Sequence, residues 1–557
     1  MRAQRTDGGL HVQAIAGSHV VFFGFDWPAA RAGQLQGYAI HRADHGTGRA
    51  DWLTAQKRYA STDPGLDKGT AVSTRKHPLQ TFQWADYTVR PGVEYTYRIV
   101  ALGGTPAMLD VLAEVEIPVR TITRTRSGHA IHFNRGAIAA QEYARRFANR
   151  APEDVPNNQA FDWLSRGLFE SLLAFIATAQ AGDALHAAIY EARHAPVLDA
   201  LRAARERGVA VRIIYDAKRN GDDHHPAFPR EDNIGELDLA QLADAGIARE
   251  KNPGYIAHNK FIVLSQQGAP SAVWGGSLNW SPNGFFGQLN TGHEVWDANV
   301  AQQFLDYWTL LAADPSGVAL RAAVTSAFPL PAQWPDGCTP VFSPRQQRDA
   351  LDRYIAEIQR ADAVLLTLAF SIDDKLGRAL APEHRGMRYV LMDGLKGNRQ
   401  QVDKIRHIVK EIRATESGRV AMGAYLRTNA LDQFLLERSN AMAQHVQFIH
   451  TKFMLIDPLG KRPLVISGSA NFSLASSKQN DENMLVIAGD EEVADIYLGE
   501  FMRSYTHYAF RDAVRAALAN GTFFASNPLN EDCSWAQAYY GTGFRSRQRR
   551  YFARSAV

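Results

Sequence analysis

The chain has 557 residues, 45% of them hydrophobic, and its 61 Lys and Arg against 58 Asp and Glu leave a net charge of +3. This length predicts two to four domains, and the apolar fraction excludes a wholly disordered chain. The nearly balanced charge gives no global preference for nucleic acid. Two cysteines, Cys338 and Cys533, exclude a disulfide framework and a Cys-rich zinc site, and they fit a reducing compartment.

The N-terminal segment "MRAQRTDGGLHVQ" lacks the apolar run of a signal peptide. The longest apolar stretches, such as "AVLLTLAF" from Ala363, are too short to span a bilayer and are typical of buried strands. We therefore expect a cytoplasmic protein, although export by a specialised machine would leave no such mark.

The first 125 residues predict a β-domain. "GYAIHRA" from Gly37 and "EYTYRIVAL" from Glu94 alternate apolar and polar residues, as half-buried strands do. The segment "DYTVRPGVEYTYRIVAL", with its Pro-Gly turn, resembles the end of a fibronectin type III domain. We expect a β-sandwich over residues 1–125, with an unspecific small β-domain as the alternative.

After residue 125, helical and strand patterns alternate twice. "FDWLSRGLFESLLAFIATA" reads as one helix and "VAVRIIYD" as a strand ending at Asp216, and later "SPRQQRDALDRYIAEIQRA" and "GMRYVLMD" repeat that order up to Asp393. The proline-rich "AFPLPAQWPDGCTP" separates the two series. The predicted fold class is α/β, with two halves over residues 126–330 and 331–513, each with a mostly parallel sheet. Residues 514–557 form a basic and aromatic extension.

Each half carries the same two motifs at the same spacing. The octets "HNKFIVLS" from His258 and "HTKFMLID" from His450 are followed by "GGSLNWS" and "SGSANFS". Along a strand, the His and Lys of each octet share one face. Two neighbouring cations are reasonable there if an anion binds between them, and Ser and Asn can hydrogen-bond the same anion. These positions predict a phosphodiester pocket: His258, Lys260, Ser277, Asn279, His450, Lys452, Ser469 and Asn471.

The paired pattern H-x-K-x4-D and G-S-x-N resembles the phospholipase D superfamily, over about residues 126–511. The alternative is two ordinary strands with incidental His and Lys. The resemblance implies pseudo-symmetric α-β-α halves with the active site between them, so that no oligomer is required. It also implies a reaction without metal or other cofactor, in which His258 attacks phosphorus and His450 protonates the leaving oxygen.

The first motif departs from the pattern, because Ser265 stands where the second has Asp457. Seven strand residues at ~3.3 Å each would separate this position from the histidine by ~23 Å, so it cannot orient the ring directly. The resemblance places the orienting acid after G-S-x-N: Glu482 in the second half and Glu294 in the first, with Asn290 nearer. A surface-strand glutamate is the alternative for Glu294. We predict an active enzyme, against the rival view of a decayed first half.

The substrate class stays open between a phospholipid head group, a DNA or RNA phosphodiester, another phosphodiester, and no substrate at all on an inert scaffold. Two motifs in one chain favour lipid enzymes by resemblance, and near-neutral charge gives a nuclease little help. The tail "FRSRQRRYFAR" from Phe544 suits single-stranded nucleic acid, an anionic membrane surface, or neither. "DDHHP" at Asp222 is interpreted as a solvated loop rather than a metal site. The predicted partner is a phospholipid or membrane surface, with nucleic acid as the alternative.

Overall fold

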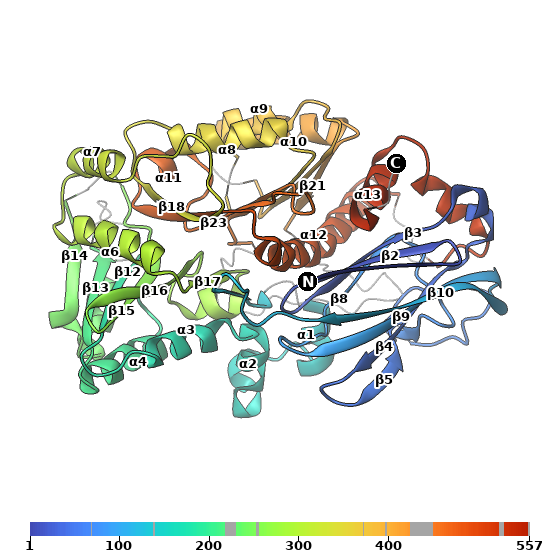
Figure 1. The fold of residues 1–557 in the computed structure, drawn as a ribbon, viewed down its shortest axis with the longest axis horizontal. Helices are drawn as coiled ribbons and strands as arrows, with labels where there is room; N and C mark the ends of the chain where they lie inside the picture. Colours follow the sequence, from blue (N-terminus) through green and yellow to red (C-terminus); the bar gives the residue numbers. More distant parts are fainter. Residues whose placement is uncertain are drawn as a thin grey trace.

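The computed structural model describes residues 1–67, 70–136, 140–217, 230–251, 255–370, 372–395, 398–423, 449–522 and 528–554. The N-terminal domain lies beside the two α/β halves (Figure 1). The long helix α12 (Glu491–Ala519) lies at the centre and contacts the N-terminal domain and both halves. The predicted α/β class with two halves and a preceding β-domain is confirmed.

The N-terminal domain consists of two four-stranded antiparallel sheets, in the orders β1-β2-β3-β8 and β10-β9-β4-β5. Aromatic side chains such as Phe23, Tyr38 and Tyr97 fill the core between them. The Tyr95 hydroxyl accepts a hydrogen bond from Arg90 N at 2.9 Å, a local lock typical of β-sandwich corners. The strands are β1 (Arg2–Asp7), β2 (Leu10–Ala16), β3 (Val21–Asp26), β4 (Gly37–Asp44), β5 (Arg49–Trp52), β6 (Thr54–Ala55), β7 (Val72–Ser73), β8 (Gln83–Asp86), β9 (Glu94–Thr105) and β10 (Met108–Arg120).

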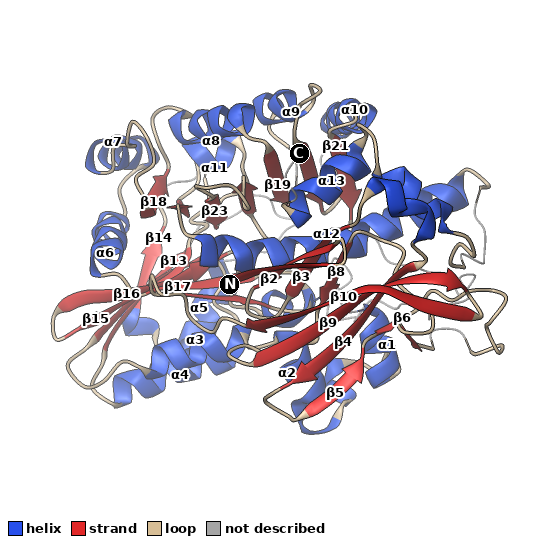
Figure 2. Ribbon diagram, turned by 45° about the vertical axis from the view of Figure 1, so that its right-hand side comes forward, coloured by secondary structure: helices blue, strands red, loops and turns tan. Residues whose placement is uncertain are grey.

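The first half is built on a seven-stranded sheet in the order β11-β17-β16-β15-β12-β13-β14. Helices flank this sheet on both sides (Figure 2). Its elements are β11 (His129–Phe133), α1 (Ala140–Phe147), α2 (Gln159–Ser165), α3 (Leu168–Ala177), β12 (Ala184–Ile189), α4 (Ala195–Glu206), β13 (Ala210–Asp216), α5 (Arg230–Leu239), β14 (Gly246–Arg249), β15 (Lys260–Gln266), β16 (Ala269–Gly276), β17 (Thr291–Val295), α6 (Ala298–Ala312) and α7 (Gly317–Ala327).

The second half repeats this topology strand for strand, in the order β18-β24-β23-β22-β19-β20-β21. The two octets therefore occupy equivalent strands, β15 and β22. Its elements are β18 (Gly337–Ser343), α8 (Asp349–Arg360), β19 (Ala363–Leu368), α9 (Asp374–Leu380), β20 (Met387–Met392), α10 (Arg399–Ala414), β21 (Gly418–Met422), β22 (Phe453–Ile456), β23 (Leu464–Gly468), α11 (Leu474–Lys478) and β24 (Glu482–Ala488).

The prediction of mostly parallel sheets is wrong, because both sheets are mixed. In each half the β-α-β part is parallel, as in β12-β13-β14, whereas the motif strands pair antiparallel. In the first half one reason is the tight connection from β15 to β16, where Gln267 and Gly268 both have positive φ and reverse the chain. A two-residue hairpin can join only antiparallel strands.

The single helix predicted for "FDWLSRGLFESLLAFIATA" is two helices, α2 and α3. Arg166 and Gly167 between them both adopt left-handed backbone angles, which end α2. The buried Arg166 guanidinium binds Glu500 of α12 at 3.0 Å. A buried charge needs a partner, so this long-range ion pair stabilises the break.

The C-terminal extension folds onto the other domains as helix α13 (Phe544–Ala553), which contacts β3 of the sandwich and β20 of the second half. Phe552 is fully buried, and Arg549 pairs with Asp26. The predicted boundary at 513 falls inside α12, which continues to Ala519.

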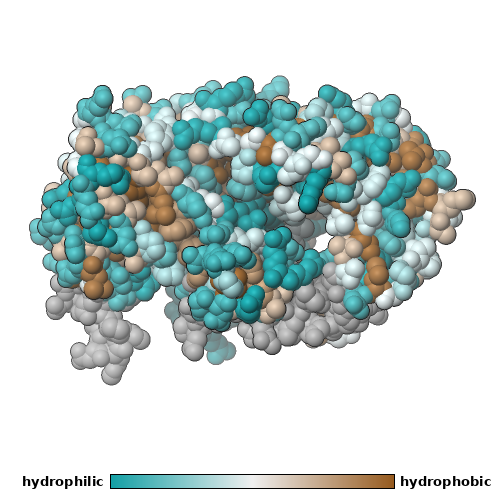
Figure 3. Space-filling view, turned by 90° about the horizontal axis from the view of Figure 1, so that it is seen from below, coloured by the Kyte–Doolittle hydropathy of each residue, from teal (hydrophilic) through white to brown (hydrophobic). Residues whose placement is uncertain are grey.

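Hydrophilic side chains cover most of the face in Figure 3 and surround a central recess, whereas apolar side chains form scattered patches. Among the described residues, no helix combines the length and apolar character needed to cross a bilayer.

Candidate active site

The two motif histidines lie where the halves meet, each just before its motif strand. Backbone hydrogen bonds join the halves here: His450 N donates to Leu289 O, and Asp481 N donates to Ile256 O, both at 3.0 Å. His258 and His450 are 5% and 3% exposed. The structure thus brings together His–Lys pairs that are 192 residues apart in the sequence.

Each histidine takes its hydrogen-bond partner from the opposite half. His258 Nδ1 lies 2.9 Å from Glu482 Oε2, and His450 Nδ1 lies 2.9 Å from Asn290 Oδ1. Both partners are acceptors, so each Nδ1 carries the proton and each Nε2 is left for chemistry. The prediction that Glu482 serves the histidine of its own half is therefore wrong. The partners cross because β17 and β24 begin at the interface between the halves.

Glu294, the predicted orienting acid of the first half, contacts neither of the motif histidines, His258 and His450. It receives a hydrogen bond from Trp296 Nε1 at 2.9 Å and lies 3.3 Å from His132 Nε2. It sits four residues along β17 from Asn290, which is ~13 Å of strand. The sequence did contain the better signal: Asn290 follows Ser277 by 13 residues, as Glu482 follows Ser469.

The motif serines orient these partners instead of pointing their protons at a ligand. Ser277 Oγ donates to Asn290 Oδ1 at 2.8 Å, and Ser469 Oγ donates to Glu482 Oε2 at 2.7 Å. A hydroxyl has one proton to donate, so the predicted direct role of the serines in phosphate binding is corrected to an indirect one.

The motif asparagines are better placed to bind a ligand. The side-chain oxygens of Asn279 and Asn471 are buried and accept no hydrogen bond from the described residues. An unpartnered buried polar atom is costly, so the same orphan acceptor at equivalent positions of both halves indicates a site that a hydrogen-bond donor completes; the NH₂ group of each amide, not this oxygen, could donate to a phosphate.

The lysines are held by the histidine backbone. Lys260 Nζ donates to His258 O, and Lys452 Nζ donates to His450 O, both at 2.7 Å. Each ammonium has three donors, so two remain for phosphoryl oxygens. Burial lowers the pKa of Lys260 to about 7, and burial together with the charge of Lys260 holds the pKa of Lys452 well below its usual value.

Burial disfavours the protonated forms of the histidines as well. Burial lowers the pKa of His258 to about 4, although Glu482 opposes the shift. Burial, then the charges of Lys452 and Lys260, holds the pKa of His450 well below its usual value. A bound phosphodiester would raise all four values, because its negative charge stabilises the protonated forms.

Two aspartates that the sequence analysis did not assign support this arrangement. Asp216 Oδ2 accepts Ala257 N at 2.7 Å, and Asp393 Oδ1 accepts Ile449 N at 2.8 Å. Asp216 is the last residue of β13 and Asp393 directly follows the equivalent strand β20, and each fixes the backbone immediately before a motif histidine. Their charges also favour the protonated forms of Lys260 and Lys452, respectively. The available signal was that both predicted strands end in Asp.

The mismatch between Ser265 and Asp457 lies at the far end of the motif strands. Asp457 Oδ1 accepts Ala363 N at 2.7 Å and so ties β22 to β19. Ser265 Oγ is buried and has no partner among the described residues. In the first half the equivalent tie comes from Asp183 before β12, whose Oδ1 accepts Gln267 N at 3.1 Å.

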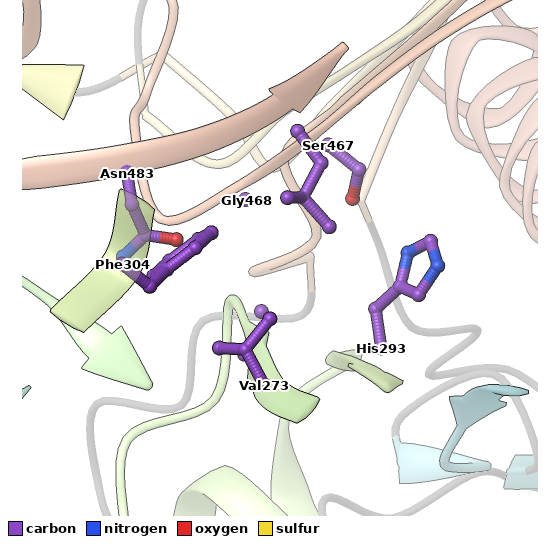
Figure 4. A pocket seen from close by; sticks show the side chains of 9 residues that line it. Val273, His293, Phe304, Ser467, Gly468 and Asn483 are labelled. Atoms are coloured by element: carbon purple, nitrogen blue, oxygen red, sulfur yellow. The ribbon is translucent and has the colours of Figure 1, made fainter. Parts of the chain in front are cut away.

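Aromatic rings and a small cavity complete the surroundings. The Tyr190 ring lies 5.1 Å from the His258 ring, and Phe370 lies 6.2 Å from His450, measured between centroids. Between the sheets a small cavity is lined by Val273, His293, Phe304, Ser467 and Asn483, together with Gly275, Gly276, Gly468 and Leu485 (Figure 4). It lies next to the glycines that precede Ser277 and Ser469.

A metal ligand set is not assembled in the described ranges, where no three His, Cys, Asp or Glu side chains form a suitable group. "DDHHP" at 222–226 falls outside the described residues.

Comparisons with known proteins agree with this architecture. A family model described as "Cardiolipin synthase, PLD-like domain" matches residues 172–309 and 355–505, just over half of the chain. No curated protein sequence matches.

Similar solved structures include three bacterial proteins. Polyphosphate kinase from Porphyromonas gingivalis is 14% identical with a TM-score of 0.36, and the match covers 59% of this chain and 46% of the kinase. Phosphatidylserine synthase from Haemophilus influenzae is 11% identical, with a TM-score of 0.44 and coverages of 62% and 84%. Nuc from Salmonella typhimurium, a phospholipase D family member, is 17% identical, with a TM-score of 0.22 and coverages of 30% and 94%. The chain thus matches less than half of the length of the kinase.

Proposed function

The chain belongs to the phospholipase D superfamily, and from this premise we propose that it is a metal-independent phosphodiesterase acting on phospholipid head groups through a covalent phosphohistidine. The observation that carries the proposal is the convergence of two buried His–Lys pairs, each supported from the opposite half. The four cationic or ionisable groups suit one phosphodiester anion, whose negative charge would add to that of Glu482.

In the first step, His258 Nε2 attacks phosphorus and the bond from phosphorus to the leaving oxygen breaks. His450 Nε2–H donates its proton to that oxygen. Lys260 and Lys452 stabilise the charge on the phosphoryl oxygens with their remaining donors. In the second step, His450 takes a proton from water, the resulting hydroxide attacks phosphorus, and His258 is released.

The unequal partners of the histidines support this division of roles. Phosphorylated on Nε2 and protonated on Nδ1, the His258 ring is cationic, and the Glu482 carboxylate stabilises that charge. His450 is held by the neutral amide of Asn290, which stabilises the imidazolium less and so leaves a stronger acid. A nucleophile beside Glu482 and a proton donor beside Asn290 therefore match each group to its environment.

A lipid substrate is supported by the family description and by the fate of the C-terminal tail. The Arg-rich tail was the feature that favoured nucleic acid. In α13, however, Phe544 and Phe552 are buried, and Arg547 and Arg549 pair with Glu383 and Asp26. These groups hold the domains together, which weakens the case for a stacking surface for bases.

The proposal is tested by incubating the protein with phosphatidylcholine, phosphatidylethanolamine and plasmid DNA in parallel, each with and without EDTA. We expect phosphatidic acid from a lipid in both conditions and intact plasmid. Nicked plasmid without lipid turnover would overturn the substrate class. Lipid turnover that stops in EDTA and returns with a divalent ion would overturn the metal-independent mechanism.

A further inference from the structure

A second candidate binding site lies at the opposite end of the second sheet from the histidines. A groove of about 550 Å³ is lined there by Asp362, Asp457, Leu459, Gly460, Lys461, Arg462, Arg550, Tyr551 and Arg554. Its walls are the loop after β22 and the last turn of α13. Strand β22 separates it from His450 by roughly 20 Å, so it does not belong to the active site.

The symmetry of the fold shows that the groove is not a by-product of the catalytic architecture. In the first half the equivalent connection, from β15 to β16, is the two residues Gln267 and Gly268. In the second half it is the longer segment 457–463, which contains Lys461 and Arg462. The active site uses both halves alike, so it does not require this longer, basic loop.

The charge of the groove favours an anion. Four cationic side chains and two carboxylates line it, and Arg462 is also paired with Asp336 at 2.8 Å. One carboxylate, Asp457, is already engaged by Ala363 N. Lys461 and Arg554 are exposed and form no salt bridge with another described residue. Arg550 lines the groove as well and has no carboxylate partner among the described residues, so three cations face the two carboxylates and the groove keeps a net positive charge.

We infer that the groove binds a phosphate-bearing ligand of small-molecule size, supplied either by a soluble phosphate ester or by a lipid head group. Its volume lies in the range of small-ligand pockets. Arginine forks and a lysine ammonium are the usual protein partners of phosphate. The Tyr551 ring adds a flat apolar wall, and its hydroxyl is fixed by Leu459 N at 3.3 Å. This site stands independently of the catalytic proposal.

The test measures pyrophosphate binding by calorimetry in the full chain. The groove variant carries Lys461→Gln and Arg554→Gln, and the matched control carries Lys410→Gln and Arg360→Gln, two exposed cations on α10 and α8. A Lys452→Ala variant identifies binding at the catalytic site. We expect the groove variant to bind pyrophosphate at least roughly ten-fold more weakly at this site than the wild type does. The Lys452→Ala variant and the control should bind at this site with unchanged affinity.

Unchanged pyrophosphate affinity in the groove variant, or a single event that disappears in Lys452→Ala alone, would overturn the inference. The charge reversal Lys461→Glu gives a second reading, because it leaves the fold of an exposed loop intact and should weaken binding further. Sedimentation with phosphatidylcholine vesicles, with and without phosphatidic acid, distinguishes a lipid head group from a soluble phosphate ester as the ligand.

If the wild type sediments with vesicles that contain phosphatidic acid and the groove variant does not, the ligand is a lipid head group. If the wild type binds pyrophosphate but does not sediment with these vesicles, the ligand is a soluble ester.

Discussion

The crossed pairing of His258 with Glu482 makes a sharp prediction for the substitution Glu482→Gln. In the structure, one carboxylate oxygen accepts both His258 Nδ1–H at 2.9 Å and Ser469 Oγ–H at 2.7 Å. The Asn290 amide already makes the same two contacts with His450 and Ser277, so an amide can satisfy this geometry. The substitution therefore removes the charge while the acceptor remains.

The size of the effect follows from the burial of the pair. Glu482 is fully buried, and hydrogen bonds to charged groups contribute about 1.5–3 kcal/mol. If this stabilisation is realised as the His258 ring becomes cationic, kcat/KM should fall by roughly 10- to 150-fold. A chromogenic phosphodiester such as bis(p-nitrophenyl) phosphate, followed at saturating and limiting concentrations, measures the loss.

Glu294→Gln is the matched control, because Glu294 is also a buried glutamate after a G-S-x-N motif but contacts neither histidine. Its kcat/KM per folded molecule should stay within about two-fold of wild type. Equal losses in both variants, or full activity in Glu482→Gln, would refute the assignment of Glu482 as the group that stabilises His258.

Three further outcomes are expected. Asp457→Ala should lower the free energy of unfolding in urea by about 1–3 kcal/mol, because Ala363 N loses its acceptor. Ser265→Asp should change kcat only modestly, and a large rate gain in this variant would contradict the structural role of the position. Asp393→Asn should lower kcat more than it raises KM and move the alkaline limb of the pH–rate profile to lower pH, since a charge that keeps Lys452 protonated is lost; an unmoved limb would contradict it. Burial holds the pKa of His19, His293, His450 and His507 well below 6.5, so these side chains stay neutral in the folded chain while the unfolded chain binds protons as pH falls below 6.5. In acid titrations the free energy of unfolding should therefore fall by about 1.4 kcal/mol per pH unit for each such histidine, and a flat pH dependence would contradict this.

Local motifs predicted the repeat but not the pairing across it. The equal offsets from His258 to Ser277 and from His450 to Ser469 are properties of one chain segment each, and they correctly indicated two equivalent halves. Which acid reaches which histidine depends on how the halves pack, and no local pattern contains that information. Asn290 occupies the position equivalent to Glu482, 13 residues after the motif serine, but it is not acidic, whereas Glu294 is acidic but does not occupy the equivalent position.

The break between α2 and α3 shows the same limit. The amphipathic pattern around Arg166 continues through the break, and Gly167 alone does not end a helix reliably. The left-handed Arg166 is stabilised by Glu500, which lies 334 residues away in the sequence. The tail shows a related limit, because Phe544 and Phe552 are buried and Arg547 and Arg549 pair with Glu383 and Asp26 in other domains of the same chain, which its local sequence could not indicate.

The roles of the two histidines give the last prediction, and the crossed partners fix its direction. If His258 attacks, a His450→Asn variant should still form a covalent adduct with a nitrophenyl phosphodiester, because nitrophenolate leaves without a proton. His258→Asn should form none, since its Glu482 would then stabilise no cationic ring. Trapping each variant, quenching in base where phosphohistidine survives, and locating the adduct by mass spectrometry measures this directly. An adduct on His450 in the His258→Asn variant would reverse the roles and show that Asn290 suffices to support the nucleophile. No adduct in either variant or in wild type would remove the covalent mechanism and leave direct attack by water.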